Sequence, residues 1–176
     1  MVFWVLGAYN RLVGLRSQVV QALQVLATQW QANAQGLRSE IANLSRAPES
    51  DSAWASLGDD AASWRLLAQA AKQFQACLAA LAAKPHALPT RDNLSSASAA
   101  HEVMQSAWQR LKNTHDDLAG EAVPQSLELL WQHQQQQALD KLQHYNGHAS
   151  AYNHAVQQFP ALLVAWIFGF KMAQLL

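Results

Sequence analysis

Apolar residues recur every three or four positions along most of the chain, which is the spacing of one face of an α-helix. The first such stretch starts before Tyr9 and continues to about Leu44, and residues 45–52, which include Pro48, read as a loop. We therefore expect a long first helix with one buried face. Its apolar stripe comprises Leu12, Leu15, Val19, Leu23, Leu26, Trp30, Leu37, Ile41 and Leu44.

Three further segments have the same helical spacing. The second stripe runs from Trp54 to Leu81, and Gly58–Asp60 can delay the start of its helix. The third helix is expected to follow a cap at Asn93 or Ser95 and to end near Gly120. The fourth begins with Pro124 in its first turn, and Pro160 is expected to kink or restart it. Its stripe comprises Leu127, Leu130, Trp131, Ala138, Leu142, Tyr145, Ala149, Tyr152, Val156 and Phe159.

No alternating strand pattern of useful length interrupts these helices. Four helices joined by short loops predict an all-α fold, an antiparallel up-down-up-down four-helix bundle whose first and fourth helices are long. At ~1.5 Å per residue, each of these two helices is expected to be roughly 50 Å in length.

Charge and cysteine content narrow the possible functions. The 12 basic and 12 acidic residues cancel, so the net charge gives no support for nucleic-acid binding, which normally needs a basic surface. Cys77 is the only cysteine, which leaves no intrachain disulfide and no cysteine-based metal site, and we expect it to be a small buried hydrophobic residue. Five tryptophans fall on or beside the apolar stripes and are expected in the core rather than in a ligand cage: Trp30, Trp54, Trp64, Trp108 and Trp131.

No arrangement of residues in the sequence indicates catalysis. No serine lies in a nucleophile-elbow setting, and glycine-rich phosphate loops are absent. Asp140, His144 and His148 recur at intervals of four on one helix face, but zinc takes about four ligands with outer-shell support. We therefore expect neither an enzyme nor a bound cofactor or metal.

The dipeptide Tyr-Asn occurs three times. Tyr145–Asn146 and Tyr152–Asn153 lie seven residues apart and share one helix face, while Tyr9–Asn10 is close to the other end of the chain. An antiparallel bundle brings that first copy near the last one. A buried tyrosine hydroxyl needs a partner, which a neighbouring asparagine can supply. These residues predict a polar, aromatic cluster at one end, which either fixes packing and register or binds a ligand or partner: Tyr9, Asn10, Tyr145, Asn146, Tyr152 and Asn153.

Two stretches, YNRLVGLRSQV at 9–19 and YNGHASAYNHAVQQFPALLVAWIFGF at 145–170, together resemble the LemA family. That family has a Tyr-Asn-x-Leu-Val segment after an N-terminal membrane anchor, and paired Tyr-Asn motifs, Phe-Pro and Phe-Gly-Phe near its C-terminus. The matching residues are Tyr9, Asn10, Leu12, Val13, Tyr145, Asn146, Tyr152, Asn153, Val156, Phe159, Pro160, Phe168, Gly169 and Phe170.

The resemblance implies a helical bundle tethered to the membrane, at the bacterial inner membrane on a side that the sequence leaves open. It implies a scaffold or interaction module with an unidentified protein partner, and it brings no catalytic residues. The chain departs from the family in two places. It has TQWQANAQGLRSEI where the family has an Arg-rich stretch with Ile-Pro-Asn, and WQHQQQQALDKLQ where the family has a Glu and an Arg.

The two ends of the chain are apolar but short. Neither Val2–Ala8 nor Ala161–Phe170 reaches the ~20 residues that cross a bilayer. Residues 1–8 are interpreted as the remnant of an anchor, 9–159 as the bundle and 160–176 as an apolar tail. One hypothesis places more apolar residues upstream of Met1.

A second hypothesis keeps Met1 as the start and joins both ends in a patch that contacts the bilayer interface. Alternatively, the tail folds back over the helix ends. The expected membrane contacts are Val2, Phe3, Trp4, Leu6, Leu162, Trp166 and Phe168.

An alternative function, of a different class from a membrane-bound scaffold, is that of a soluble bundle that binds a small molecule or metal at the Tyr/Asn cluster. A stabilising compound in a thermal shift panel would favour that alternative.

Overall fold

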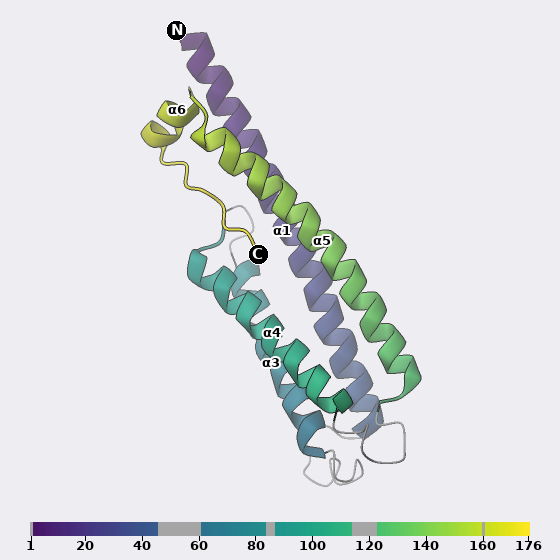
Figure 1. Cartoon of the computed structure of the whole chain (residues 1–176). Helices are drawn as coiled ribbons and strands as arrows, with labels where there is room; N and C mark the ends of the chain where they lie inside the picture. Colours follow the sequence, from purple (N-terminus) through teal and green to yellow (C-terminus); the bar gives the residue numbers. More distant parts are fainter. Residues whose placement is uncertain (1, 46–60, 84–86, 114–122, 160) are drawn as a thin grey trace.

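The computed structural model describes residues 2–45, 61–83, 87–113, 123–159 and 161–176. All of its regular structure in these ranges is α-helical (Figure 1). The helices are α1 (Val2–Ser45), α3 (Ala61–Ala82), α4 (Arg91–Asn113), α5 (Gln125–Gln157) and α6 (Ala161–Phe168).

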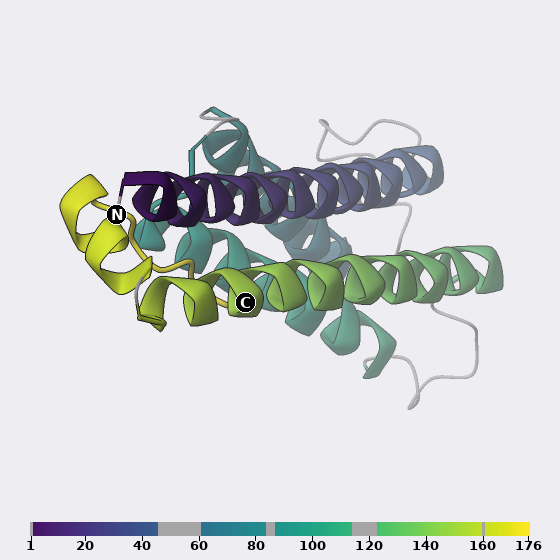
Figure 2. The same ribbon diagram turned by 90° about the horizontal axis from the view of Figure 1, so that it is seen from above.

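The helices form an up-down bundle, as the sequence predicted. The long helices α1 and α5 lie side by side in opposite directions along most of their length (Figures 1 and 2). Helices α3 and α4 form a hairpin that packs on the half of this pair farther from the chain's N-terminus. The other half of α1 and α5 therefore extends beyond the hairpin, toward α6.

The structure corrects the predicted start of one helix. Helix α4 begins at Arg91 because Thr90, rather than Asn93 or Ser95, provides the cap: its Oγ1 accepts a hydrogen bond from the Asn93 backbone N–H at 3.3 Å. This helix ends at Asn113, and the predicted end near Gly120 lies outside the described residues, as does the start of the second stripe at Trp54.

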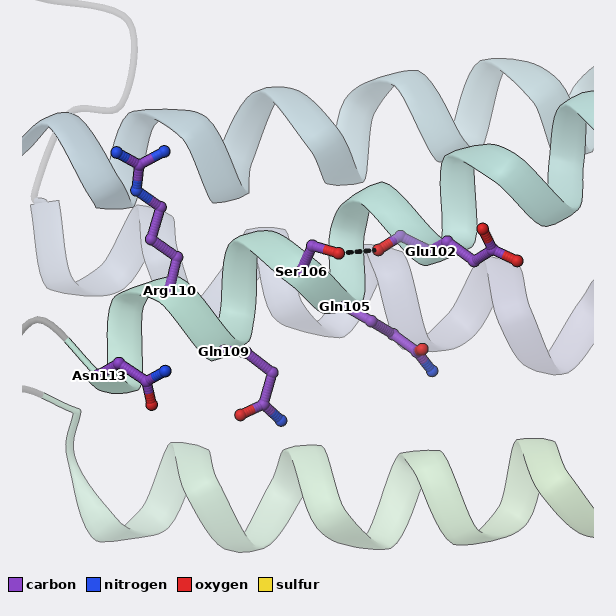
Figure 3. A pocket seen from close by; sticks show the side chains of 6 residues that line it. All are labelled: Glu102, Gln105, Ser106, Gln109, Arg110 and Asn113. Atoms are coloured by element: carbon purple, nitrogen blue, oxygen red, sulfur yellow. Dashed lines mark hydrogen bonds between the residues drawn. The ribbon is translucent and has the colours of Figure 1, made fainter.

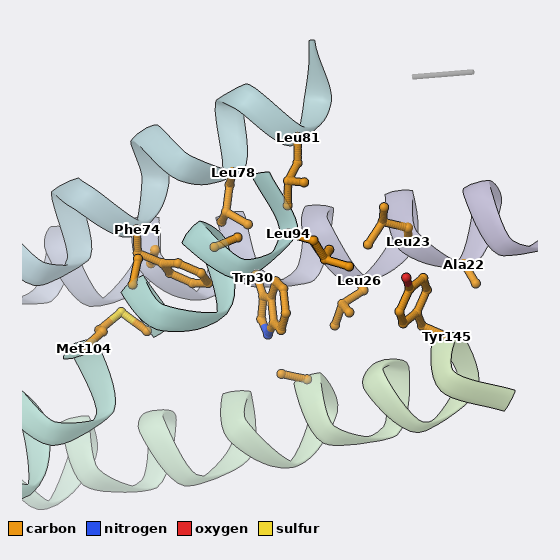
Figure 4. Close-up of a cluster of buried hydrophobic side chains, with 14 of the residues drawn as sticks. Ala22, Leu23, Leu26, Trp30, Phe74, Leu78, Leu81, Leu94, Met104 and Tyr145 are labelled. Atoms are coloured by element: carbon orange, nitrogen blue, oxygen red, sulfur yellow. The ribbon is translucent and has the colours of Figure 1, made fainter. Parts of the chain in front are cut away.

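The apolar stripes predicted from the sequence make the core. Trp30 of α1 packs edge-on against Phe74 of α3 at 5.6 Å between ring centroids, and Trp108 of α4 stacks on Trp131 of α5 at 4.5 Å. Figure 4 shows how side chains from all four long helices meet around Trp30. Cys77, which was expected to be buried, is half-buried and packs at the edge of this core.

Phe159 is the clearest error of the predicted stripes. It was placed on the buried face of the fourth helix, but its side chain is 79% exposed. The helical period ends before it, because α5 stops at Gln157 and Gln158 has an extended backbone with φ −77° and ψ 133°. The ring of Phe159 instead lies 6.4 Å from that of Trp4, on the first turns of α1.

The last eight residues leave α6 and turn back along the bundle. Gly169 ends α6 with a left-handed φ of 69°, which glycine adopts without steric cost, and Phe170 N–H bonds to Ala165 O at 2.9 Å. The segment then runs without regular secondary structure along α5 toward the start of α4 (Figure 1). From here on we call residues 170–176, the last part of the apolar segment 160–176, the tail.

Candidate functional site

The two Tyr-Asn dipeptides of α5 hold the tail through its backbone. Tyr145 and Tyr152 are fully buried, and each hydroxyl donates a hydrogen bond to a carbonyl of the tail. Tyr145 bonds to Gln174 O at 2.6 Å, and Tyr152 bonds to Lys171 O at 2.9 Å. The expected partners were neighbouring asparagines, so the hydroxyls are satisfied by a different kind of group.

Each asparagine pairs with one tail residue through two hydrogen bonds. Asn146 Nδ2 donates to Leu176 O at 2.8 Å, and its Oδ1 accepts from Leu176 N at 3.0 Å. Asn153 makes the same pair of bonds with Ala173, both at 2.7 Å. An asparagine amide thereby replaces the donor and acceptor that a neighbouring β-strand would offer. We call Tyr145, Asn146, Tyr152 and Asn153 the tail clamp.

The seven-residue spacing of the dipeptides matches the spacing of the tail backbone. Seven residues of helix rise roughly 10 Å, and three residues of extended chain also span roughly 10 Å. Accordingly, the two tyrosines bond to carbonyls three residues apart, and the two asparagines also pair with residues three apart. The repeat therefore fixes the register of the tail on α5 and holds the two segments antiparallel.

Burial shifts the ionisation of the clamp hydroxyls to higher pH. Burial raises the pKa of Tyr145 to about 12, and it also raises the pKa of Tyr152, an effect that the positive charge of Arg16 partly opposes. Both side chains are therefore neutral hydrogen-bond donors at physiological pH.

The third Tyr-Asn copy lies beside the segment that leads into the tail. The ring of Tyr9 is 4.9 Å from Phe168 and 5.8 Å from Phe170, whereas Asn10 is exposed. The structure thus brings the four clamp residues together on one segment of chain and places Tyr9 at the entry to that segment. Sequence reasoning missed the tail residues themselves, because backbone groups carry no signature in the sequence.

Large apolar side chains are exposed together at the end of the bundle where α1 starts and α5 ends. Trp166, on α6, is 84% exposed, and contacts of Trp4 and Tyr9 with Phe159 and Phe168 join the two ends of the chain there. We call this surface the apolar pole; it comprises Trp4, Val5, Leu6, Phe159, Leu162, Leu163, Trp166, Ile167, Phe168 and Met172.

Five of the expected membrane contacts, Trp4, Leu6, Leu162, Trp166 and Phe168, belong to the apolar pole. The other two, the side chains of Val2 and Phe3, are outside the described part of the structure. The tail folds back along α5, but the exposed side chains of α6 stay uncovered by the described residues. Within the described residues, no helix combines the length and the apolar character needed to cross a bilayer.

A cavity of about 370 Å³ lies between the tail clamp and the start of α4. Its lining includes Arg91, Tyr145 and Gln174, together with Leu88, Pro89, Met172 and Ala173. The Oε1 atom of Gln174 is buried and accepts no hydrogen bond from the described residues. A buried acceptor of this kind is costly unless a donor reaches it.

A larger, open hollow of about 790 Å³ runs along α4 (Figure 3). It is lined by the polar side chains Glu102, Gln105, Ser106, Gln109, Arg110 and Asn113. The Ser106 hydroxyl donates to the backbone carbonyl of Glu102 at 2.8 Å, while the Glu102 carboxylate points away from it. This pair lacks the hydroxyl-to-base contact of an activated nucleophile.

The histidines form no metal site in the described residues, where no three His, Cys, Asp or Glu side chains are grouped for one ion. The rings of His144 and His148 lie 4.5 Å apart on α5. His101 instead lies in the core between Trp30 and Phe74, at 5.2 Å from each ring. Burial lowers the pKa of His101, so it is neutral at physiological pH.

Comparison with known proteins gives no relative for this arrangement. No family model matches the chain, and no curated protein or solved structure matches it either.

Proposed function

We propose that this protein is a membrane-associated helical bundle of the LemA type, which acts as a non-enzymatic scaffold for a protein partner. The observation that carries the proposal is the apolar pole, where ten large apolar side chains from both ends of the chain are exposed together. Contiguous apolar patches of several hundred Å² are uncommon on isolated proteins and mark surfaces that contact a partner or a membrane.

The composition of the pole fits a bilayer interface. Trp4 and Trp166 are both exposed, and tryptophan is enriched at the level of the lipid headgroups. The adjoining Leu162, Leu163 and Ile167 supply aliphatic side chains that reach the acyl region. The pole would therefore rest on the membrane, and the long axis of α1 and α5 would carry the α3–α4 hairpin away from it.

The tail clamp supports this role by fixing α6. Helix α6 has only eight residues, too few to be stable alone in water. It is bounded on one side by the end of α5 and on the other by the tail, whose backbone the clamp holds through six hydrogen bonds. The clamp thus presents Trp166 and Ile167 on a helix whose two ends are held.

Flotation of the full chain with liposomes tests the proposal. We expect the protein to float with the vesicles and the double variant Trp166→Ser/Ile167→Ser to remain in the dense fractions. The matched control is Leu129→Ser, which also removes an exposed apolar side chain, 59% exposed, but at the opposite end of α5. Failure of the unaltered chain to float, or equal flotation of the double variant, would contradict the proposal.

A second candidate function is the binding of a small molecule beside the tail clamp. It is favoured by the unpartnered Gln174 Oε1 and by Arg91, which both line the 370 Å³ cavity. Such a ligand would donate a hydrogen bond to the glutamine and carry a negative charge toward the arginine. A thermal shift of several degrees with one metabolite, lost in Arg91→Gln, would support this candidate.

A further inference from the structure

The charges of this chain are unevenly distributed along it, although their sum is zero. All 12 acidic residues lie between Glu40 and Asp140, so residues 1–39 and 141–176 contain no carboxylate side chain. The same two segments carry the basic residues Arg11, Arg16, Arg38, Lys141 and Lys171. The two ends of the chain are therefore basic, and the middle is acidic.

The outer parts of these two acid-free segments, at the start of α1 and at the end of the chain, meet at the apolar pole. The first half of α1, the end of α5, α6 and the tail extend past the α3–α4 hairpin (Figure 1). Arg11 follows Tyr9 on α1, and Lys171 follows the Phe170 ring that Tyr9 contacts. Arg16 lies about one and a half turns further along α1 than Arg11, and its positive charge partly opposes the burial that raises the pKa of Tyr152, whose hydroxyl bonds to the carbonyl of Lys171. The three cations thus lie close to the pole.

No carboxylate among the described residues neutralises these cations. The ion pair of Lys112 with Glu128 belongs to the opposite end of the bundle, where α4 finishes and α5 begins. Arg11 and Lys171 are exposed, and Arg16 is half-buried. Proteins bind anionic membranes by inserting apolar side chains and by attracting the headgroups with positive charge. This patch offers both, because three unpaired positive charges lie beside exposed tryptophan and aliphatic side chains.

We propose that the apolar pole selects anionic lipid headgroups through Arg11, Arg16 and Lys171. The proposal rests on the membrane association put forward above and adds the class of lipid. A second copy of the chain is a poorer occupant, because two poles that meet would bring six like charges together at a desolvated contact. An anionic bilayer instead complements both the apolar and the charged part of the surface.

Vesicle co-sedimentation of the full chain tests the lipid class. Phosphatidylcholine vesicles are compared with vesicles that also contain phosphatidylglycerol, at low and at physiological salt. Each basic residue near an anionic surface strengthens binding by about fivefold, so we expect at least about tenfold stronger binding to the anionic vesicles. Added salt should reduce this difference, because it screens the headgroup charge.

Two double variants locate the charges responsible. Arg11→Gln/Lys171→Gln should lose about tenfold or more in binding to anionic vesicles, with binding to neutral vesicles unchanged. Lys72→Gln/Lys141→Gln removes the same net charge from exposed positions away from the pole and should change binding by less than about twofold.

The outcomes separate the lipid class from the membrane association itself. Equal binding to both kinds of vesicle overturns the lipid class and leaves membrane association intact, whereas no binding to either overturns both. A pole-dependent dimer in sedimentation equilibrium, with no vesicle binding, would also overturn the proposal and assign the pole to a second copy.

Discussion

The side-chain amide of Asn153 and the backbone of Ala173 form a closed pair of hydrogen bonds, both 2.7 Å long. Asn146 repeats the pair with Leu176 two helical turns earlier. The tail of the chain is therefore bound to α5 much as an edge strand is bound to a sheet, with the asparagine amides in place of a neighbouring backbone. This relationship determines where α6 and the apolar pole lie.

Removal of one clamp asparagine should destabilise the protein. Asn153→Ala leaves the buried backbone groups of Ala173 without partners, which costs about 1–3 kcal/mol. Urea unfolding followed by circular dichroism measures the change in the free energy of unfolding. Asn10→Ala is the matched control, because Asn10 belongs to the third Tyr-Asn copy but is exposed; its effect should stay within about 0.5 kcal/mol. Equal effects at both positions would contradict the assigned role of the clamp.

The Tyr145 hydroxyl should make stability depend on alkaline pH. Its pKa is raised by burial from 10.0 to about 12 in the folded protein. Between these values the unfolded chain loses the proton that the folded chain keeps, so the free energy of unfolding falls as pH rises, by up to about 1.4 kcal/mol per pH unit. Below pH 10 this contribution is constant. Tyr145→Phe should flatten the slope of the urea midpoint against pH across this window, and an unchanged slope would refute the burial of the hydroxyl.

His101 should produce the opposite dependence at acidic pH. Burial between Trp30 and Phe74 lowers its pKa below 6.5, so the folded protein holds it neutral while the unfolded chain takes up a proton. Stability is therefore fully present above pH 6.5 and falls as the pH drops through that value. His101→Gln should weaken this acid dependence, as measured by thermal unfolding at a series of pH values. His133→Gln, at an exposed position of α5, should leave the dependence as it is.

The Trp108–Trp131 stack should be a major link between the α3–α4 hairpin and the long helices. Trp131→Ala removes a ring that is only 7% exposed and leaves a cavity against Trp108, which costs about 3–5 kcal/mol. Trp166→Ala deletes an equally large ring that is 84% exposed and should cost less than about 0.5 kcal/mol. Chemical denaturation of the two variants in parallel checks the contrast. Similar losses of stability would contradict either the burial of Trp131 or the exposure of Trp166.

The helices could be predicted from the sequence because their signal is carried by side chains. Leu12, Leu26 and Trp30 recur at helical spacing, and each is buried against another element. Phe159 continues the same spacing but is exposed, because the spacing alone does not show that the helix stops at Gln157. The pattern describes which face a helix would bury, and the backbone turn at Gln158 decides where that face ends.

Only the α5 side of the candidate site could be predicted from the sequence. The repeated dipeptides identified Tyr145, Asn146, Tyr152 and Asn153, and burial of the tyrosines was expected from their place on the stripe. Their partners are backbone atoms of Lys171, Ala173, Gln174 and Leu176, and any residue except proline offers the same pair of groups. The clamp therefore has a sequence signature on α5 but none on the tail.

The orientation of the bundle on a bilayer is the central claim, and a spin label tests it most directly. In a Cys77→Ala background, nitroxide labels are placed at Trp166→Cys and, as control, at Leu129→Cys near the start of α5. On addition of vesicles containing phosphatidylglycerol, we expect collisions with oxygen to increase and collisions with a polar nickel complex to decrease at position 166, with no change at 129. Unchanged accessibility at position 166, or an equal change at both positions, would contradict the proposed contact of the apolar pole with the membrane.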